Sequence, residues 1–329
     1  MISTDRRPNV WALARRATLG RGRRTILALA ITAACLPLAP RPAPGERAPL
    51  SVVASIAPLA EFVRQVGGER VRVRVLVPPG QDPHTFTLKP SQLVALSRAR
   101  LLVLNGLGLE FWAERLLSAV ESPRLRVVRL GEGLDPSPEE PEATGAEPAA
   151  ARRSEADPMG AHGADPHVWL DPLQAAEMVE RLGEVLAGLD PAHARDYRAN
   201  AARFRAELAT LHGEYRNALS RVSRRTFFVL HPGYGHLARR YGLRQEAVVK
   251  GLGEFEPSPA RVAAVIRAVR RLGVRVIFAE RPLSAAAART IAEEAGIRVA
   301  TLDPLGGADN RGYLATMRGN LAALTSALR

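Results

Sequence analysis

Short runs of β-branched residues alternate with helical periods in two separate parts of the chain. In the first part the expected strands cover residues 51–56, 71–77, 101–105 and 126–130, with helices at about 57–67, 90–98 and 110–120. In the second part the expected strands cover residues 226–230, 247–250, 274–279 and 298–302. Strands separated by helices of about 10–15 residues are typical of βαβ units and parallel sheets. We therefore expect an α/β fold with two lobes, each a mainly parallel sheet flanked by helices.

A single apolar stripe lies between these two parts. Apolar side chains recur every three or four residues, which is the period of an amphipathic helix, at Tyr197, Ala201, Phe204, Leu208, Leu211, Tyr215, Leu219 and Val222. Asp190 and Pro191 suit the start of such a helix, with the aspartate as N-cap. The stripe predicts one long rigid linking helix over residues 191–222. It joins an N-terminal lobe at 50–190 to a C-terminal lobe at 223–329.

Two segments differ from the lobes in composition. Residues 1–45 begin with seven arginines before residue 25 and continue with an apolar run at 25–39, which is typical of a signal peptide. Residues 131–164 are acidic and rich in proline and alanine, and they predict a mobile insert. We therefore expect an exported protein, in the periplasm or at the outer face of the cytoplasmic membrane. Cys35 resembles the cysteine of a lipoprotein box, so both a lipid anchor and ordinary cleavage stay open.

The net charge of +13 raises the question of a nucleic-acid or membrane partner. Nearly half of this charge lies within residues 1–40, and the other arginines are scattered as pairs such as Arg224-Arg225. No stretch of the lobes interleaves basic and aromatic side chains as nucleic-acid-binding surfaces do. We therefore expect a solvated basic surface and no nucleic-acid partner. Because Cys35 is the single cysteine, a cysteine zinc cluster and a thiol nucleophile are excluded.

Three histidines and one aspartate lie where ligands of α/β sheets are expected. His84 lies in the loop after 71–77, His167 follows the acidic insert, His231 follows 226–230 and Asp303 follows 298–302. Ligands bind such sheets just beyond the carboxyl ends of the strands. Imidazole nitrogen together with carboxylate oxygen suits zinc, whereas an oxygen-rich site suits magnesium or calcium. The pattern therefore favours one metal site made of these four side chains.

Other polar residues near these positions have simpler interpretations. Asp82 and Asp165 each stand two residues before a histidine of the set and favour turn formation. Glu280, at the same sheet edge, is a candidate to orient a ligand imidazole or an arginine. The remaining side chains that stand out are expected to pack or to face solvent: His236 as a structural histidine, His193 and His212 on the solvated face of the long helix, and Trp112 and Trp169 in the N-terminal lobe.

Several motifs together resemble the metal-binding receptors of bacterial ABC importers, from about residue 50 to the C-terminus. They lie at residues 53–56, 78–86, 88–91, 167–172, 231–235, 239–242, 256–258 and 302–305. The resemblance implies two α/β lobes, joined by a rigid helix, that hold one divalent ion in the cleft between them. It assigns His84 and His167 as ligands from the first lobe, and His231 and Asp303 as ligands from the second. Manganese- and iron-binding members usually carry glutamate at the position of His231, so zinc is the expected cargo and Mn²⁺ or Fe²⁺ the alternative.

This sequence departs from the family pattern in two places. Zinc-binding members often carry a histidine-rich acidic loop where this chain has residues 131–164, which contain only His162. A zinc-collecting role is therefore not expected of the insert. His231 is followed by Pro-Gly-Tyr, where Asp-Ala-Phe is common in the family.

Three classes of function are compatible with such a site. A transport receptor fills the coordination shell with protein groups, as three histidines and one carboxylate do. A zinc hydrolase keeps one coordination position for an activated water and needs a base, for which Glu280 is the candidate. The sequence has no His-Glu-x-x-His or Gly-x-Ser-x-Gly motif to support that class, and the third class is a surface adhesin stabilised by its metal. We expect a monomeric receptor without catalytic residues, which delivers Zn²⁺ to an ABC permease.

Overall fold

The computed structural model describes residues 48–87, 89–120, 122–134, 165–248, 257–280, 285–306 and 311–329. The expected signal peptide at 1–45, the lipid-box Cys35 and the acidic insert from residue 135 onward lie outside the described residues. In the ranges just given, every helix lacks either the length or the apolar character that a membrane crossing requires.

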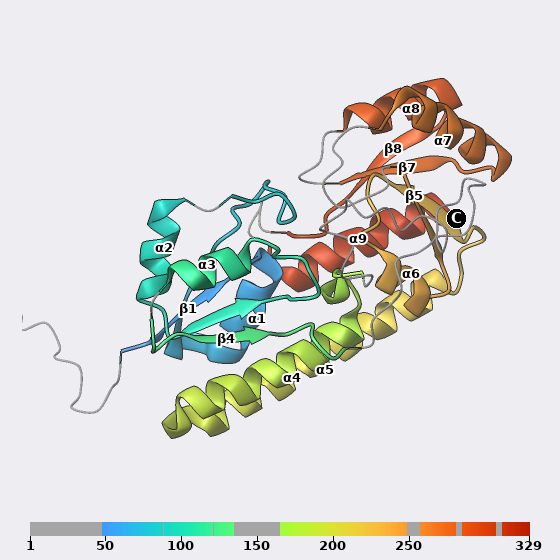
Figure 1. Cartoon of the computed structure of the whole chain (residues 1–329). Coiled ribbons are helices and arrows are strands. Elements are labelled where there is room, and N and C mark those ends of the chain that lie inside the picture. The colour runs from blue at the N-terminus through green and yellow to red at the C-terminus, as the bar shows by residue number, and fades with distance from the viewer. Residues whose placement is uncertain are drawn as a thin grey trace, which may run out of the picture. The chain divides into compact units, whose positions relative to one another are not determined.

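Two parallel sheets of four strands form the framework of the chain (Figure 1). The strands are β1 Leu50–Ala54, β2 Val71–Val75, β3 Leu101–Leu104, β4 Arg126–Arg129, β5 Thr226–Val229, β6 Arg244–Ala247, β7 Val276–Glu280 and β8 Arg298–Leu302. Their order is β2-β1-β3-β4 in the first sheet and β6-β5-β7-β8 in the second, and every pairing is parallel. The same topology therefore occurs twice, which confirms the expected α/β class.

The position of each strand within its sheet follows from its sequence. All four residues of β3 are buried, because a central parallel strand is covered on both faces and is a continuous apolar run. The edge strand β2 instead alternates valines with exposed Arg72 and Arg74. Charged side chains on an exposed edge discourage pairing with another chain.

The strand expected at 247–250 is wrong by three residues, because β6 covers Arg244–Ala247. Its sequence Arg-Gln-Glu-Ala lacks the apolar pattern that reveals a strand. Gln245 and Glu246 are nonetheless buried. Gln245 Oε1 accepts a hydrogen bond from the Tyr234 backbone N–H, and Glu246 Oε1 accepts one from Arg244 Nε. Buried polar groups are tolerated when they are hydrogen-bonded. The local sequence does not show that Gln245 and Glu246 have such partners, so the strand was not predicted at these residues.

The helices of the described residues connect the strands and cover the sheets. They are α1 Ala57–Gly67, α2 Pro90–Ser97, α3 Ala113–Ala119, α4 Pro172–Leu189, α5 Ala194–Leu219, α6 Gly235–Arg240, α7 Pro259–Arg271, α8 Ala286–Ala295 and α9 Tyr313–Leu328. Two short 3-10 turns, η4 Val168–Leu170 and η5 Pro191–His193, precede α4 and α5. The helices α1, α2 and α3 lie where the sequence predicts them, although α3 begins three residues later.

The long apolar stripe forms α5, a helix of 26 residues that buries its apolar side chains from Tyr197 to Leu219. Asp190 does not cap a backbone N–H; its Oδ2 accepts a hydrogen bond from the Tyr197 hydroxyl. The helix α4, which is not among the helices expected from the sequence, packs along α5 (Figure 1). A Cβ atom at Gly183 of α4 would lie 2.9 Å from Ala201 Cβ, so glycine permits this close approach. The predicted long helix is therefore one member of a packed pair.

Candidate metal centre

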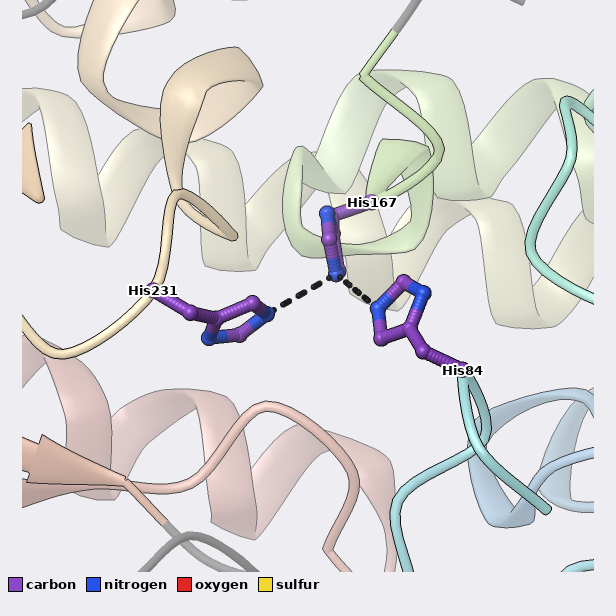
Figure 2. A group of neighbouring side chains, drawn as sticks. All are labelled: His84, His167 and His231. Carbon is purple, nitrogen blue, oxygen red and sulfur yellow. Dashed lines mark hydrogen bonds between the residues drawn. The ribbon is translucent and has the colours of Figure 1, made fainter. Parts of the chain in front are cut away.

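Three histidine rings converge in the described structure: His84, His167 and His231 (Figure 2). His167 Nε2 lies 3.2 Å from His84 Nε2 and 3.2 Å from His231 Nε2. Ligand atoms of all three rings lie within 4.8 Å of one another. A tetrahedral zinc ion with Zn–N bonds of about 2.0–2.1 Å keeps its nitrogen ligands about 3.3–3.4 Å apart. The separations of His167 Nε2 from the other two Nε2 atoms are therefore close to those between ligands of a single ion.

The backbone around two of these rings repeats one turn. His84 lies in the loop after β2, and His167 directly precedes η4. Asp82 Oδ1 accepts a hydrogen bond from the His84 N–H at 2.9 Å, and Asp165 Oδ1 accepts one from the His167 N–H at 2.9 Å. An aspartate that bonds the backbone two residues later forms an Asx turn. The predicted turn-forming role of both aspartates is confirmed.

Buried carboxylates orient two of the rings. Asp165 Oδ1 lies 2.7 Å from His167 Nδ1, and Glu280 Oε2 lies 2.8 Å from His231 Nδ1. A carboxylate at Nδ1 keeps the proton on that nitrogen and directs Nε2 toward a metal. Glu280 Oε1 also accepts hydrogen bonds from the backbone N–H groups of Leu230 and His231. The expectation that Glu280 orients an imidazole is confirmed.

Burial and neighbouring charges set the protonation of the three rings. Burial, followed by the charges of the other two rings, lowers the pKa of His84 well below its ordinary value. Burial also lowers the pKa of His167, although Asp165 opposes this effect. Burial acts in the same direction on His231, but the charge and hydrogen bond of Glu280, together with the charges of Asp82 and Asp165, outweigh it and raise the pKa of that ring. At neutral pH His84 and His167 are thus neutral, whereas His231 binds its proton more firmly than a free imidazole does.

Asp303 lies at its expected strand end, but it is not among the atoms that lie within 4.8 Å of one another. Its Oδ1 accepts hydrogen bonds from the backbone N–H groups of Leu305 and Gly306 at 3.1 Å and 2.7 Å. Asn320 of α9 fixes its backbone, because the amide accepts from the Asp303 N–H and donates to the Asp303 carbonyl. Within the described residues no hydrogen bond involves Oδ2.

Two buried tryptophans hold the loops of this region. Trp112 Nε1 donates a hydrogen bond to the carbonyl of Pro83 at 3.1 Å, and Pro83 directly precedes His84. Trp169 Nε1 donates to the carbonyl of Pro304 at 2.7 Å, directly after Asp303. Both indoles are buried as expected, but Trp169 reaches the loop after β8 and not just its own lobe. A buried indole N–H needs a hydrogen-bond acceptor, so the two tryptophans could be expected from the sequence to hold other segments. The sequence does not show which acceptor each indole finds.

A buried carboxylate that sequence reasoning missed, Glu110, braces the same sheet edge. Its Oε1 accepts hydrogen bonds from the Ser55 hydroxyl at 2.6 Å and the Asn105 backbone N–H at 2.8 Å. The side chain of Asn105 in turn donates to the carbonyl of Pro166 at 2.8 Å, next to His167. Burial raises the pKa of Glu110. This chain of contacts fixes the His167 loop to the ends of β1 and β3.

His236 is structural, as predicted. Its Nε2 donates to the carbonyl of Asp165 at 2.9 Å, and its Nδ1 lies 3.1 Å from Gln174 Nε2. The ring is buried at 1% exposure. It therefore supports the backbone of the His167 turn from α6.

The prediction that His193 and His212 are solvated holds only in part, because each ring also has a protein partner. His193 Nδ1 lies 2.6 Å from Asp190 Oδ2 in the turn before α5, and His212 Nδ1 lies 3.2 Å from the Tyr241 hydroxyl. Both rings are half-buried. Helical periodicity identifies the polar face of a helix, but it does not show which neighbouring elements cover that face.

Replacement of Glu280 by glutamine is expected to weaken zinc binding about 10–100-fold, the usual effect of removing a carboxylate behind a ligand histidine. Glutamine keeps the size of the side chain but loses the negative charge at His231 Nδ1. The measurement is a competition titration of zinc against a chelator of known affinity. Glu246→Gln, a buried carboxylate that pairs with Arg244 in β6, is the matched control and should retain full affinity. Equal affinities of the two variants would contradict this role of Glu280.

Comparison with known proteins points to one family. The family model described as "ZnuA: Zinc-uptake complex component A periplasmic" matches residues 52–327. The zinc-binding lipoprotein AdcA of Streptococcus pneumoniae (strain ATCC BAA-255 / R6) is 27% identical over 281 residues. This match covers 84% of the chain but only 55% of AdcA, so the chain spans about half the length of that relative.

Two solved structures show the same fold. A crystal structure of ZnuA matches with a TM-score of 0.74 and 32% identity, over 85% of this chain and 100% of that one. The laminin-binding protein Lmb of Streptococcus agalactiae, described as a bifunctional protein with adhesin and metal transporting activity, matches with a TM-score of 0.73 and 28% identity. That match covers 85% of this chain and 100% of Lmb.

Proposed function

Because the chain belongs to the ZnuA family of periplasmic zinc-uptake components, we propose that it captures one Zn²⁺ ion outside the cytoplasmic membrane and delivers it to an ABC permease. The observation that carries the proposal is the 3.2 Å spacing of His167 Nε2 from the Nε2 atoms of His84 and His231. Zinc is the cargo of the protein and not a resident cofactor. Imidazole ligands suit zinc better than manganese, which prefers carboxylate, carbonyl and water oxygens.

The proposed ligands are Nε2 of His84, His167 and His231, together with Oδ2 of Asp303. Oδ1 of Asp303 already accepts two backbone hydrogen bonds, so one carboxylate oxygen is left for the ion. Three nitrogens and one oxygen give the four-coordinate shell that zinc prefers when all its ligands come from the protein. Forming this shell brings the Asp303 carboxylate closer to the three rings than it lies here.

We propose that the protein is not an enzyme. A shell filled by four side chains has no open position for the activated water of a zinc hydrolase. Glu280, the candidate base, uses Oε2 to hold His231 Nδ1 and Oε1 to accept two backbone N–H groups. A carboxylate engaged in this way is poorly placed to take a proton from a metal-bound water. The adhesin alternative rests only on similarity to laminin-binding proteins such as Lmb, and we do not propose it.

The proposed setting of the protein follows from its N-terminal segment. Residues 1–45 direct export, and the mature protein acts as a monomer in the periplasm or at the outer face of the cytoplasmic membrane. Cys35 is the residue that would carry a lipid anchor, in keeping with the lipoprotein named among the relatives. The proposed division into lobes at 50–190 and 223–329, with a linking helix at 191–222, gives each lobe two of the four ligands.

A titration with two metals tests this function. The mature protein is expected to bind one zinc ion per chain and to bind zinc more tightly than manganese, because three imidazoles dominate the shell. Elemental analysis of the purified protein gives the stoichiometry, and competition between Zn²⁺ and Mn²⁺ gives the preference. Tighter binding of manganese would identify Mn²⁺ and not Zn²⁺ as the cargo. The absence of bound metal would contradict the receptor function.

A further inference from the structure

Trp169 joins the two segments that carry His167 and Asp303. Its indole Nε1 donates a hydrogen bond to the carbonyl of Pro304 at 2.7 Å, and its own carbonyl accepts one from the Tyr313 hydroxyl at 2.6 Å. Trp169 stands two residues after His167, and Pro304 stands directly after Asp303. The two hydrogen bonds therefore connect η4 to the loop after β8 and to the first residue of α9.

This connection is shielded from water. Trp169 is 0% exposed and Tyr313 is 6% exposed, and Pro304 is buried as well. A buried hydrogen-bonding group that loses its partner costs about 1–3 kcal/mol. The indole N–H therefore has a strong preference for its carbonyl acceptor, and the loop after β8 has a defined position relative to η4.

The Asp303 loop is also held from the side of α9. Asn320 bonds both the N–H and the carbonyl of Asp303, at 2.8 Å and 2.7 Å. Together with the Pro304 carbonyl bound by Trp169, three backbone groups of two consecutive residues are fixed. The backbone of the proposed carboxylate ligand is thus set by two side chains that are distant from it in the sequence.

Other contacts of the His167 segment do not have this property. Arg240 Nε donates to Asp171 Oδ2 at 2.7 Å, and His236 donates to the carbonyl of Asp165. These two hydrogen bonds hold the segment against α6, and neither reaches the loop after β8. Trp112 donates to the carbonyl of Pro83, so it braces the His84 loop alone.

We propose that Trp169 is a positioning residue for metal capture: its indole N–H sets the Asp303 loop against the His167 turn, so that carboxylate and imidazole can enter one coordination shell. Tyr313 supports it by holding the Trp169 carbonyl. The inference rests on the function proposed above, in which both His167 and Asp303 are ligands. The Asp303 carboxylate still has to move toward the rings, but a backbone that is already ordered in the folded protein need not be ordered on binding, and such preorganisation raises affinity.

The test uses Trp169→Phe in the full chain, alone and combined with Asp303→Ala. Phenylalanine keeps an aromatic ring but removes the N–H. We expect the Kd for zinc to rise about tenfold in Trp169→Phe, the lower end of the effect of residues that support metal ligands. In the Asp303→Ala background the same substitution should have almost no further effect, because two residues that act through one contact are not additive.

Trp112→Phe is the matched control, since it removes an indole hydrogen bond of the same kind beside the other loop. Any effect of Trp112→Phe on zinc affinity should be the same with and without Asp303. Tyr313→Phe is the second variant; we expect a smaller loss of affinity that also requires Asp303, and it tests the proposal if Trp169→Phe does not fold. Melting in the presence of a chelator shows which variants are folded.

An unchanged Kd in Trp169→Phe, or an equal loss with and without Asp303, would overturn the positioning role and indicate a general structural one. Failure of the receptor function has a different signature. In that case zinc binding would be absent from the unaltered protein, or it would survive alanine substitution of the three histidines.

Discussion

Substitution of His231 by alanine is expected to remove most of the thermal stabilisation that zinc gives the protein. A ligand that binds the folded state alone, present at 100 times its Kd, stabilises that state by about 2.7 kcal/mol. Loss of a ligand nitrogen should weaken zinc at least as much as loss of a supporting residue, which is about 10–100-fold. At the same zinc concentration a 100-fold loss leaves about 0.4 kcal/mol. Thermal unfolding with excess zinc and with excess chelator measures the difference.

The matched control for this experiment is His212→Ala. His212 is a half-buried histidine of α5 that bonds the Tyr241 hydroxyl and is not one of the three converging rings. Its substitution can change the stability of the protein but should leave the increment due to zinc intact. An increment in His231→Ala equal to that of the unaltered protein would remove His231 from the site.

Zinc affinity is expected to fall steeply as the pH is lowered, because an imidazole must be neutral to bind metal. The first proton to compete is that of His231, whose pKa the Glu280 carboxylate raises against the effect of burial. Affinity should therefore reach its plateau only above that raised pKa. With one competing proton it falls about tenfold per pH unit, or about 30-fold between pH 6.5 and pH 5. Competition titrations across this range provide the measurement.

The two buried rings add a second stage to this curve. The pKa values of His84 and His167 lie below the ordinary value, mainly through burial. Their protons should compete only at lower pH, where the slope becomes steeper. Glu280→Gln removes the charge that raises the pKa of His231, so the first decline should move to lower pH in that variant. An affinity that stays constant from pH 7.5 to pH 5 would be incompatible with a shell of three imidazoles.

The limits of prediction from sequence are clearest in two elements. The strand β6 has the polar sequence Arg-Gln-Glu-Ala and is recognisable as a strand only through the partners of Gln245 and Glu246. The helix α4 was missed, although its residues pack along the predicted helix α5. Apolar periodicity predicts an element well when one face is covered by the core. It predicts poorly when polar pairs supply the cover, as in β6. The helix α4 does carry the helical period, at Ala175, Met178, Val179, Leu182 and Leu186, and this signal was overlooked.

Local pattern was enough to establish the class of the fold and to propose the residues of the candidate site. Alternating strands and helices dictate parallel sheets, and parallel sheets bring the carboxyl ends of their strands to one edge. His84, His231 and Asp303 could therefore be selected from their positions after strands, without any knowledge of contacts.

Tertiary structure alone decided how these side chains are held. The contact between Glu280 and His231 joins residues 49 positions apart, and that between Trp169 and Pro304 joins residues 135 positions apart. Helical and strand periods carry information over a few residues only, so no local pattern encodes such partners. The spacing of the three rings, the proton on His231 Nδ1 and the placement of the Asp303 loop all depend on packing between distant segments.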